Sequence, residues 1–217
     1  MKPEIMKIDM SSIIDISMDL NEKTIVWTKD AQPELRPILR IPVDECNFSW
    51  LNFGSHAGTH IDAPYYLFND KWPSDKIPWD RIIGRCQVLD LSHVNDMIDE
   101  EDLRKCDIKC KIVLIKTKNS FDPMERYNPK HVAMNAKAAR YLISQGITTI
   151  GYDYQSFERE GKNELHKIFM EKDIIPIDNL RLKDAAAKEY FLVCLPIKVT
   201  GIDAAPSRAV LFEVKNA

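Results

Sequence analysis

The segment SHAGTHIDAP, residues 55–64, contains two imidazoles, a carboxylate, a glycine and a proline. In an extended chain alternate side chains lie on one face, which predicts that His56, His60 and Asp62 point to the same side. Gly58 leaves space between them, and the small or β-branched residues in between can pack against a core. Nitrogen and oxygen donors that converge in this way indicate a site for a divalent cation.

Two other interpretations of this segment agree less well with its composition. A helix would place the two histidines four residues apart on one face, as in metalloproteases, but Gly58 and Pro64 disfavour a helix and no glutamate follows His56. Alternatively, each polar residue is hydrogen-bonded within a strand or loop, which is the common role of a single histidine. Three donors on one face favour metal binding over this second alternative.

Length, composition and charge predict a globular protein that acts on a small molecule. With 217 residues, of which 45% are hydrophobic, the chain can build a full core, and we expect residues 1–217 to form one domain, with or without an appended hairpin. The formal net charge is −3, and no basic stripe with interleaved aromatic residues is present. Nucleic acid is therefore not an expected partner, and a small-molecule substrate is.

The N-terminal segment and the cysteines predict a cytoplasmic location. Residues 1–20 contain four acidic residues and lack the basic start and apolar run of a signal peptide. No stretch reaches the about 18 apolar residues needed to span a bilayer, so no membrane association is expected. Five scattered cysteines do not form a disulfide framework, and reduced thiols are the simplest interpretation.

Local patterns place the chain in the mixed α/β class. Residues 111–117 predict a strand, residues 135–145 an alanine-rich helix that ends at Gly146, and residues 147–153 a second strand. The connection is long enough for the two strands to pair in parallel. Asn163 is a candidate N-cap of a further helix. Other β-prone runs, which together predict a mixed sheet, are residues 87–91, 174–177, 190–198 and 209–214.

The residues around the first segment also carry a resemblance to a known family. The chain is similar, nearly end to end, to the cyclase family of metal-dependent hydrolases, which includes bacterial kynurenine formamidases and isatin hydrolases. The family motif is His-x-Gly-Thr-His-x-Asp-x-Pro-x-His, and residues 56–64 match its first six defined positions. Tyr66 stands where the family has its last histidine. Residues 78–84, 150–156 and 195–209 resemble further family blocks.

The resemblance implies a complete set of metal ligands. By position these are His56, His60, Asp62, His166 and Asp178, the last being an aspartate where the family has a glutamate. Asp62 would bridge if two ions bind. Three nitrogens and two carboxylates suit zinc or manganese, with one or two ions per chain. From the residues alone, His166 is equally consistent with a helix start and Asp178 with a turn.

The resemblance also implies a fold, an assembly and an activity. The expected fold is a mixed-sheet α/β domain of the swivelling β/β/α type, and the expected assembly is a homodimer or homotetramer. The expected activity is metal-dependent hydrolysis of a small aryl amide, most directly N-formylkynurenine, as an arylformamidase of tryptophan catabolism. Metal-activated water would attack the amide.

Two residues are predicted to act on the substrate itself. Tyr66 occupies the position of the general acid, and at neutral pH a phenol donates a hydrogen bond rather than acting as a base. Trp72 is predicted to form an aromatic wall for the substrate. Two alternative functions stay open: hydrolysis of a cyclic amide or lactone, as in isatin, and a catalytically weak member that binds a metal or ligand, because Tyr66 and Asp178 depart from the family pattern.

Overall fold

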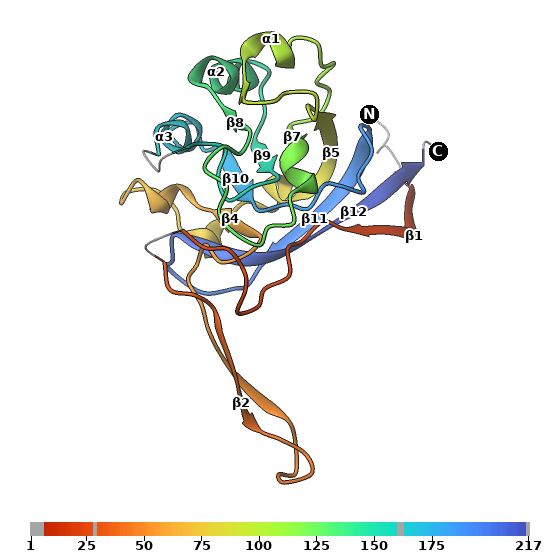
Figure 1. Ribbon diagram of the computed structural model, residues 1–217. Helices are drawn as coiled ribbons and strands as arrows, with labels where there is room; N and C mark the ends of the chain where they lie inside the picture. The colour runs from red at the N-terminus through yellow and green to blue at the C-terminus, as the bar shows by residue number, and fades with distance from the viewer. Residues whose placement is uncertain (1–6, 28–29, 160–162, 216–217) are drawn as a thin grey trace.

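A mixed β-sheet closes on itself to form a seven-stranded barrel (Figure 1). The computed structural model describes residues 7–27, 30–159 and 163–215. The strands follow one another around the barrel in the order β12-β11-β5-β7-β9-β10-β4, and β4 pairs back with β12. Their bounds are His60–Asp62 (β4), Ile83–Asp90 (β5), Ile112–Lys116 (β7), Thr149–Tyr152 (β9), Ile175–Asp178 (β10), Glu189–Pro196 (β11) and Ala204–Lys215 (β12). Strand β1, Lys7–Asp15, extends the sheet beyond β12.

The parallel half of the barrel confirms the predicted strand–helix–strand unit. Strands β5, β7, β9 and β10 pair in parallel, and helix α2, Ala136–Ser144, connects β7 with β9. The Asn135 side chain accepts a hydrogen bond from the Ala138 backbone at 3.0 Å and caps the helix. Gly146 follows the helix with φ at +74°, a conformation in which glycine carries no steric penalty.

Three helices pack on the parallel strands at one side of the barrel (Figure 1). Besides α2 these are α1, Glu100–Leu103, and α3, Glu164–Met170. Alternate residues of β7 belong to two separate core clusters on opposite faces of the strand. Val113 and Ile115 face the helices, while Ile112 and Leu114 belong to the cluster that fills the barrel. The short elements are β6 (Met97–Ile98), β8 (Ala133–Met134), η1 (Pro64–Tyr66), η2 (Ser74–Lys76), η3 (Trp79–Arg81) and η4 (Lys118–Phe121).

A long hairpin projects from the barrel (Figure 1). Its strands are β2, Glu34–Leu39, and β3, Phe48–Asn52, and within the part of the chain that the structure describes they pair with each other alone. Every residue of β3 is exposed. We refer to residues 34–52 as the arm.

The sequence predictions of the fold are confirmed at the level of a mixed α/β structure. The swivelling β/β/α arrangement and the single domain over residues 1–217 stay predictions. Among the described residues, no helix is both long enough and apolar enough to cross a membrane.

Candidate metal centre

Strand β4 carries two of the predicted ligands into the wall of the barrel. It pairs on one side with β10, where His60 lies opposite Asp178, and on the other with β12, where Asp62 lies opposite Ala204. Opposite residues in antiparallel strands have neighbouring side chains, so this register brings Asp178 beside His60. All three residues of β4 are buried.

The predicted extended conformation of residues 55–64 is wrong outside β4. Gly58 has φ at +64°, in the left-handed region, and Pro64 begins a 3₁₀ turn that ends at Tyr66. Glycine is free to adopt a positive φ, and a proline suits the first position of such a turn. The turn at Gly58 nevertheless leaves the His56 ring near the His60 ring, with 5.0 Å between their centroids.

All five ligands expected from the sequence come together in two groups that share Asp62. One group is His56, His60 and Asp62, and the other is Asp62, His166 and Asp178; in each, the candidate ligand atoms lie within 4.8 Å of one another. His166 Nε2 is 3.6 Å from an oxygen of Asp62 and 3.6 Å from an oxygen of Asp178. Two adjoining groups with a common carboxylate provide positions for one ion or for two.

Two buried carboxylate oxygens in this centre have no hydrogen-bond partner among the described residues. Asp62 Oδ1 and Asp178 Oδ1 make no hydrogen bond to any residue that the structure describes. Asp62 Oδ1 lies at ion-pair distance from two ring nitrogens, 3.0 Å from His56 Nδ1 and 3.3 Å from His60 Nε2. Buried polar atoms are usually paired, and a cation would supply the missing partner. The nitrogen and carboxylate donors therefore fit a divalent metal.

Each candidate histidine ligand is held through its second ring nitrogen. His60 Nδ1 donates to the Gly58 carbonyl at 2.8 Å, which leaves Nε2 free to bind an ion. His166 Nδ1 lies 2.6 Å from Glu158 Oε1. His56 Nε2 lies 2.8 Å from Asp203 Oδ2, so its Nδ1 faces Asp62.

The sequence analysis missed Glu158 and Asp203 as carboxylates that orient histidines. Asp203 lies within residues 195–209, which resemble a family block, but nothing in that block links it to His56. Glu158 precedes His166 by eight residues, a separation that no spacing rule links to a contact between a carboxylate and a histidine. Only the folded chain brings these pairs into contact.

Neighbouring carboxylates raise the pKa of two histidines in the centre. Burial opposes a charge on His56, but the charge of Asp62 and the hydrogen bond with Asp203 outweigh it and raise the pKa of His56 to about 10. Burial likewise opposes a charge on His166, but its interaction with Asp178, its hydrogen bond with Glu158 and the negative charge of Asp62 raise its pKa to about 10. A metal that binds here must therefore displace protons from these two rings.

Comparison with known proteins places this arrangement in a family. Residues 14–159 match the Cyclase family, described as "Putative cyclase". This chain belongs to the Cyclase family. It is 28% identical over 205 residues to the kynurenine formamidase of Salinibacter ruber, covering 92% of this chain and 97% of that protein. It is 30% identical over 212 residues to the kynurenine formamidase of Sphingopyxis alaskensis, covering 94% and 100%.

Solved structures of the Cyclase fold superimpose closely on this chain. A "potential metal-dependent hydrolase with cyclase activity" has a TM-score of 0.82 and 33% identity, covering 96% of this chain and 98% of that one. Isatin hydrolase A from Labrenzia aggregata has a TM-score of 0.81 and 19% identity, covering 94% of each chain, and shares the fold. The protein is thus a Cyclase-family member of the metal-dependent hydrolase type.

Tyr66, which replaces the last histidine of the cyclase motif, lies at the edge of the centre. Its ring centroid is 4.6 Å from that of His56 and 6.3 Å from that of His166. Burial raises the pKa of the Tyr66 phenol, and the negative charges of Asp62 and nearby carboxylates add to the effect. The phenol therefore carries its proton at neutral pH and is a hydrogen-bond donor.

The predicted N-cap Asn163 has a different role in this member of the Cyclase family. It precedes α3 with φ at +54° and makes no capping hydrogen bond with its side chain. Its Nδ2 instead donates to the Tyr66 hydroxyl at 3.2 Å. This bond uses an acceptor position of the phenol oxygen and leaves the phenol proton free for another partner.

Trp72, the predicted substrate wall, is half-buried. It packs against the cluster that fills the barrel, and its carbonyl accepts a hydrogen bond from the Tyr65 backbone at 3.3 Å. The strand register and these contacts do not bring it into the metal groups, and its contact with substrate stays a prediction.

Proposed function

We propose that this protein is a metal-dependent amidohydrolase that cleaves a small aryl amide, with N-formylkynurenine as the substrate. It would then be an arylformamidase of tryptophan catabolism. The observation that carries the proposal is the pair of His/Asp groups joined at Asp62, with two unpartnered carboxylate oxygens inside them. The kynurenine formamidases among the relatives support this choice of substrate.

Five side chains would hold zinc or manganese at one or two positions. They are His56, His60, Asp62, His166 and Asp178. A bound divalent ion supplies Lewis acidity, which polarises the amide carbonyl and lowers the pKa of water toward ~7. Glu158 and Asp203 orient two of the histidines, so the donors are in place before substrate arrives.

Tyr66 is the residue proposed to assist departure of the amine. Cleavage of an amide requires a proton at the leaving nitrogen, and positioned general acids contribute typically 10²–10⁴-fold. The Tyr66 phenol carries its proton at neutral pH, and Asn163 fixes the position of its oxygen. Tyr66 therefore donates to the departing nitrogen rather than accepting a proton from water.

The proposal is tested by metal analysis and N-formylkynurenine turnover on one metal-replete sample. We expect bound divalent metal and turnover in the wild type, and loss of both in His60→Ala. Tyr66→Phe keeps the ring and the metal groups, and we expect it to retain metal but lose turnover; unchanged turnover would exclude a catalytic role for the hydroxyl.

Two other results would replace this proposal. Metal binding with turnover of cyclic amides or lactones, but not of N-formylkynurenine, would assign an isatin-like activity. Metal binding without turnover on either class of substrate would assign a non-catalytic binding role.

A further inference from the structure

A cavity lies between two loops of the chain, outside the metal centre. Its volume is about 760 Å³, and small-molecule sites typically measure about 300–1,000 Å³. Residues of the stretch 17–25 form one wall, residues 123–125 form another, and Arg181 lines the cavity as well. None of the five candidate metal ligands lines it. The cavity is therefore a binding space in addition to the metal centre.

One wall of this cavity packs on the segment that carries the metal ligands. The backbone N–H of Met18 donates to the Thr59 hydroxyl at 2.7 Å, and Thr59 directly precedes the candidate ligand His60. Leu20 Cδ1 lies 3.5 Å from the position that a Cβ atom at Gly58 would take, which is an ordinary van der Waals distance. A ligand in the cavity is therefore held beside the metal centre.

Arg181 brings a positive charge to the cavity without an acidic partner. It follows the candidate ligand Asp178 by three residues, and its backbone N–H donates to the Ile16 carbonyl at 2.8 Å. Its Nη2 donates to the carbonyl oxygens of Ser120 and Asp122, at 3.4 and 2.9 Å. Its Nη1 is buried without a hydrogen-bond partner, and no described carboxylate pairs with the guanidinium. A carboxylate from a ligand is the acceptor that suits such a group best.

The other charges around the cavity are mostly negative and lie at the surface. Asp19, Glu22 and Glu125 line the cavity and are exposed. We call these three residues the rim. Among the described lining residues, Lys23 is the only base besides Arg181. The cation is thus half-buried, whereas the acids face solvent. A ligand with a negative group at its inner end and a positive group toward solvent matches this distribution of charge.

We propose that this cavity binds the amino-acid end of the substrate, with the α-carboxylate on Arg181 and the α-ammonium group among the acids of the rim. The inference rests on the proposed function, because N-formylkynurenine is an α-amino acid that carries such an end. The substrate class is an aryl amide joined to a zwitterionic amino-acid group. The cavity selects this class among aryl amides, while the metal centre acts on the amide bond.

Binding of two amines tests the cavity without any turnover. L-kynurenine carries the amino-acid end, whereas 2-aminoacetophenone keeps the aryl ketone and the amine but lacks that end. In calorimetric titrations of the metal-replete protein, we expect L-kynurenine to bind about 10–100-fold more tightly, which is the contribution of a charge-assisted hydrogen bond. Arg181→Met should remove this preference and leave the affinity for 2-aminoacetophenone unchanged. Unchanged metal content would show that the variant is folded.

Two further variants separate binding from packing. Arg81→Met is the matched control, because Arg81 also donates to two backbone carbonyls, those of Thr148 and Asp173, but does not line the cavity. It should keep the preference for L-kynurenine. The double variant Glu22→Gln/Glu125→Gln changes exposed residues of the rim and should weaken L-kynurenine binding about 2–5-fold. It should not weaken binding of the analogue in which hydrogen replaces the α-ammonium group.

Turnover then separates this inference from the proposed function. Arg181→Met should raise KM for N-formylkynurenine about 10–100-fold with kcat nearly unchanged, and should leave both constants unchanged for N-formyl-2-aminoacetophenone. Hydrolysis of both amides without a preference for L-kynurenine would overturn the role of the cavity and leave the proposed function standing. Absence of hydrolysis would overturn the proposed function, and the titrations would still show whether Arg181 binds the amino-acid group. Simultaneous binding of L-kynurenine and 2-aminoacetophenone would assign the cavity to a separate amino acid and overturn its assignment to the substrate.

Discussion

Strand β4 buries polar and charged side chains, whereas the arm exposes apolar side chains. On β4, His60 and Asp62 are polar or charged and at most 3% exposed, whereas on the arm the apolar Val43 is 89% exposed. A buried carboxylate is costly unless it is paired or binds a cation, and an exposed apolar surface is costly unless it is covered. On β4, neighbouring histidines lie beside the buried carboxylate and a bound cation would add to their effect, whereas the described residues leave the apolar side chains of the arm uncovered.

The largest expected effect comes from removing the charge that the two metal groups share. Asp62→Asn keeps the shape of the side chain but takes one negative charge from both groups, so we expect loss of bound metal and at least about a 10³-fold loss of turnover. Metal analysis and amide hydrolysis measure the two effects. Asp80→Asn, an exposed carboxylate on the body, is the control and should behave as wild type. Full metal content in Asp62→Asn would show that the buried charge on β4 is not needed to bind the metal, and the contrast with the arm would no longer hold.

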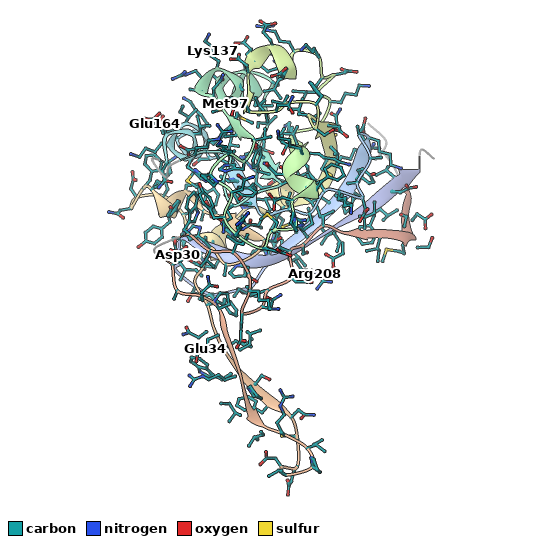
Figure 2. All side chains as sticks on the ribbon, in the orientation of Figure 1. Asp30, Glu34, Met97, Lys137, Glu164 and Arg208 are labelled. Carbon is teal, nitrogen blue, oxygen red and sulfur yellow. The ribbon has the colours of Figure 1, made fainter. Side chains whose placement is uncertain are left out.

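A smaller effect is expected from the carboxylate behind His166. Glu158→Gln removes the charge that lies 2.6 Å from His166 Nδ1, and outer carboxylates of this kind typically contribute 10–100-fold to metal affinity. We expect a loss of that size in a calorimetric titration with zinc, together with a changed absorption spectrum of the cobalt-substituted protein. Glu164→Gln, exposed at the start of α3 (Figure 2), is the matched control. An unchanged affinity in Glu158→Gln would mean that Glu158 serves folding alone.

The smallest effect is expected from an exposed apolar residue of the arm, compared with a buried apolar residue of β4. Ile61→Ala removes a fully buried side chain of β4 and should lower the unfolding free energy by about 2–5 kcal/mol at every protein concentration. Phe48→Ala removes an exposed side chain of the arm and should change it by no more than about 0.5 kcal/mol in dilute, monomeric protein. Urea unfolding of the metal-free protein, with a chelator present, compares the two. A cost for Phe48→Ala equal to that of Ile61→Ala in dilute protein would show that the arm packs on its own body.

The predictable part of the fold is the part with strong local patterns. Strand β7, helix α2 and strand β9 follow from two apolar, β-prone runs and, between them, an alanine-rich stretch that ends at a glycine. Closure of the barrel does not, because β4 has only three residues and its two pairings join it to residues more than 100 positions away. The length of the chain allowed an appended hairpin, but no local pattern placed it at residues 34–52.

The candidate site shows the same division between local and distant information. His56, His60 and Asp62 were found from their spacing, although Gly58 turns the chain where an extended conformation was expected. His166 and Asp178 entered only through the family resemblance, since each alone resembles an ordinary helix or turn residue. Glu158 and Asp203 were missed because their partnership with histidines arises from packing between separate segments.

The short length of β4 affects how the protein unfolds. This strand closes the barrel, and only a few residue pairs join it to β10 and β12. Two of its three side chains are candidate ligands, and His60 lies opposite Asp178 on β10. An ion bound to these side chains would connect β4 with β10, so the barrel would open only after the ion leaves. The lifetime of the folded protein under denaturing conditions would then follow the rate of metal release.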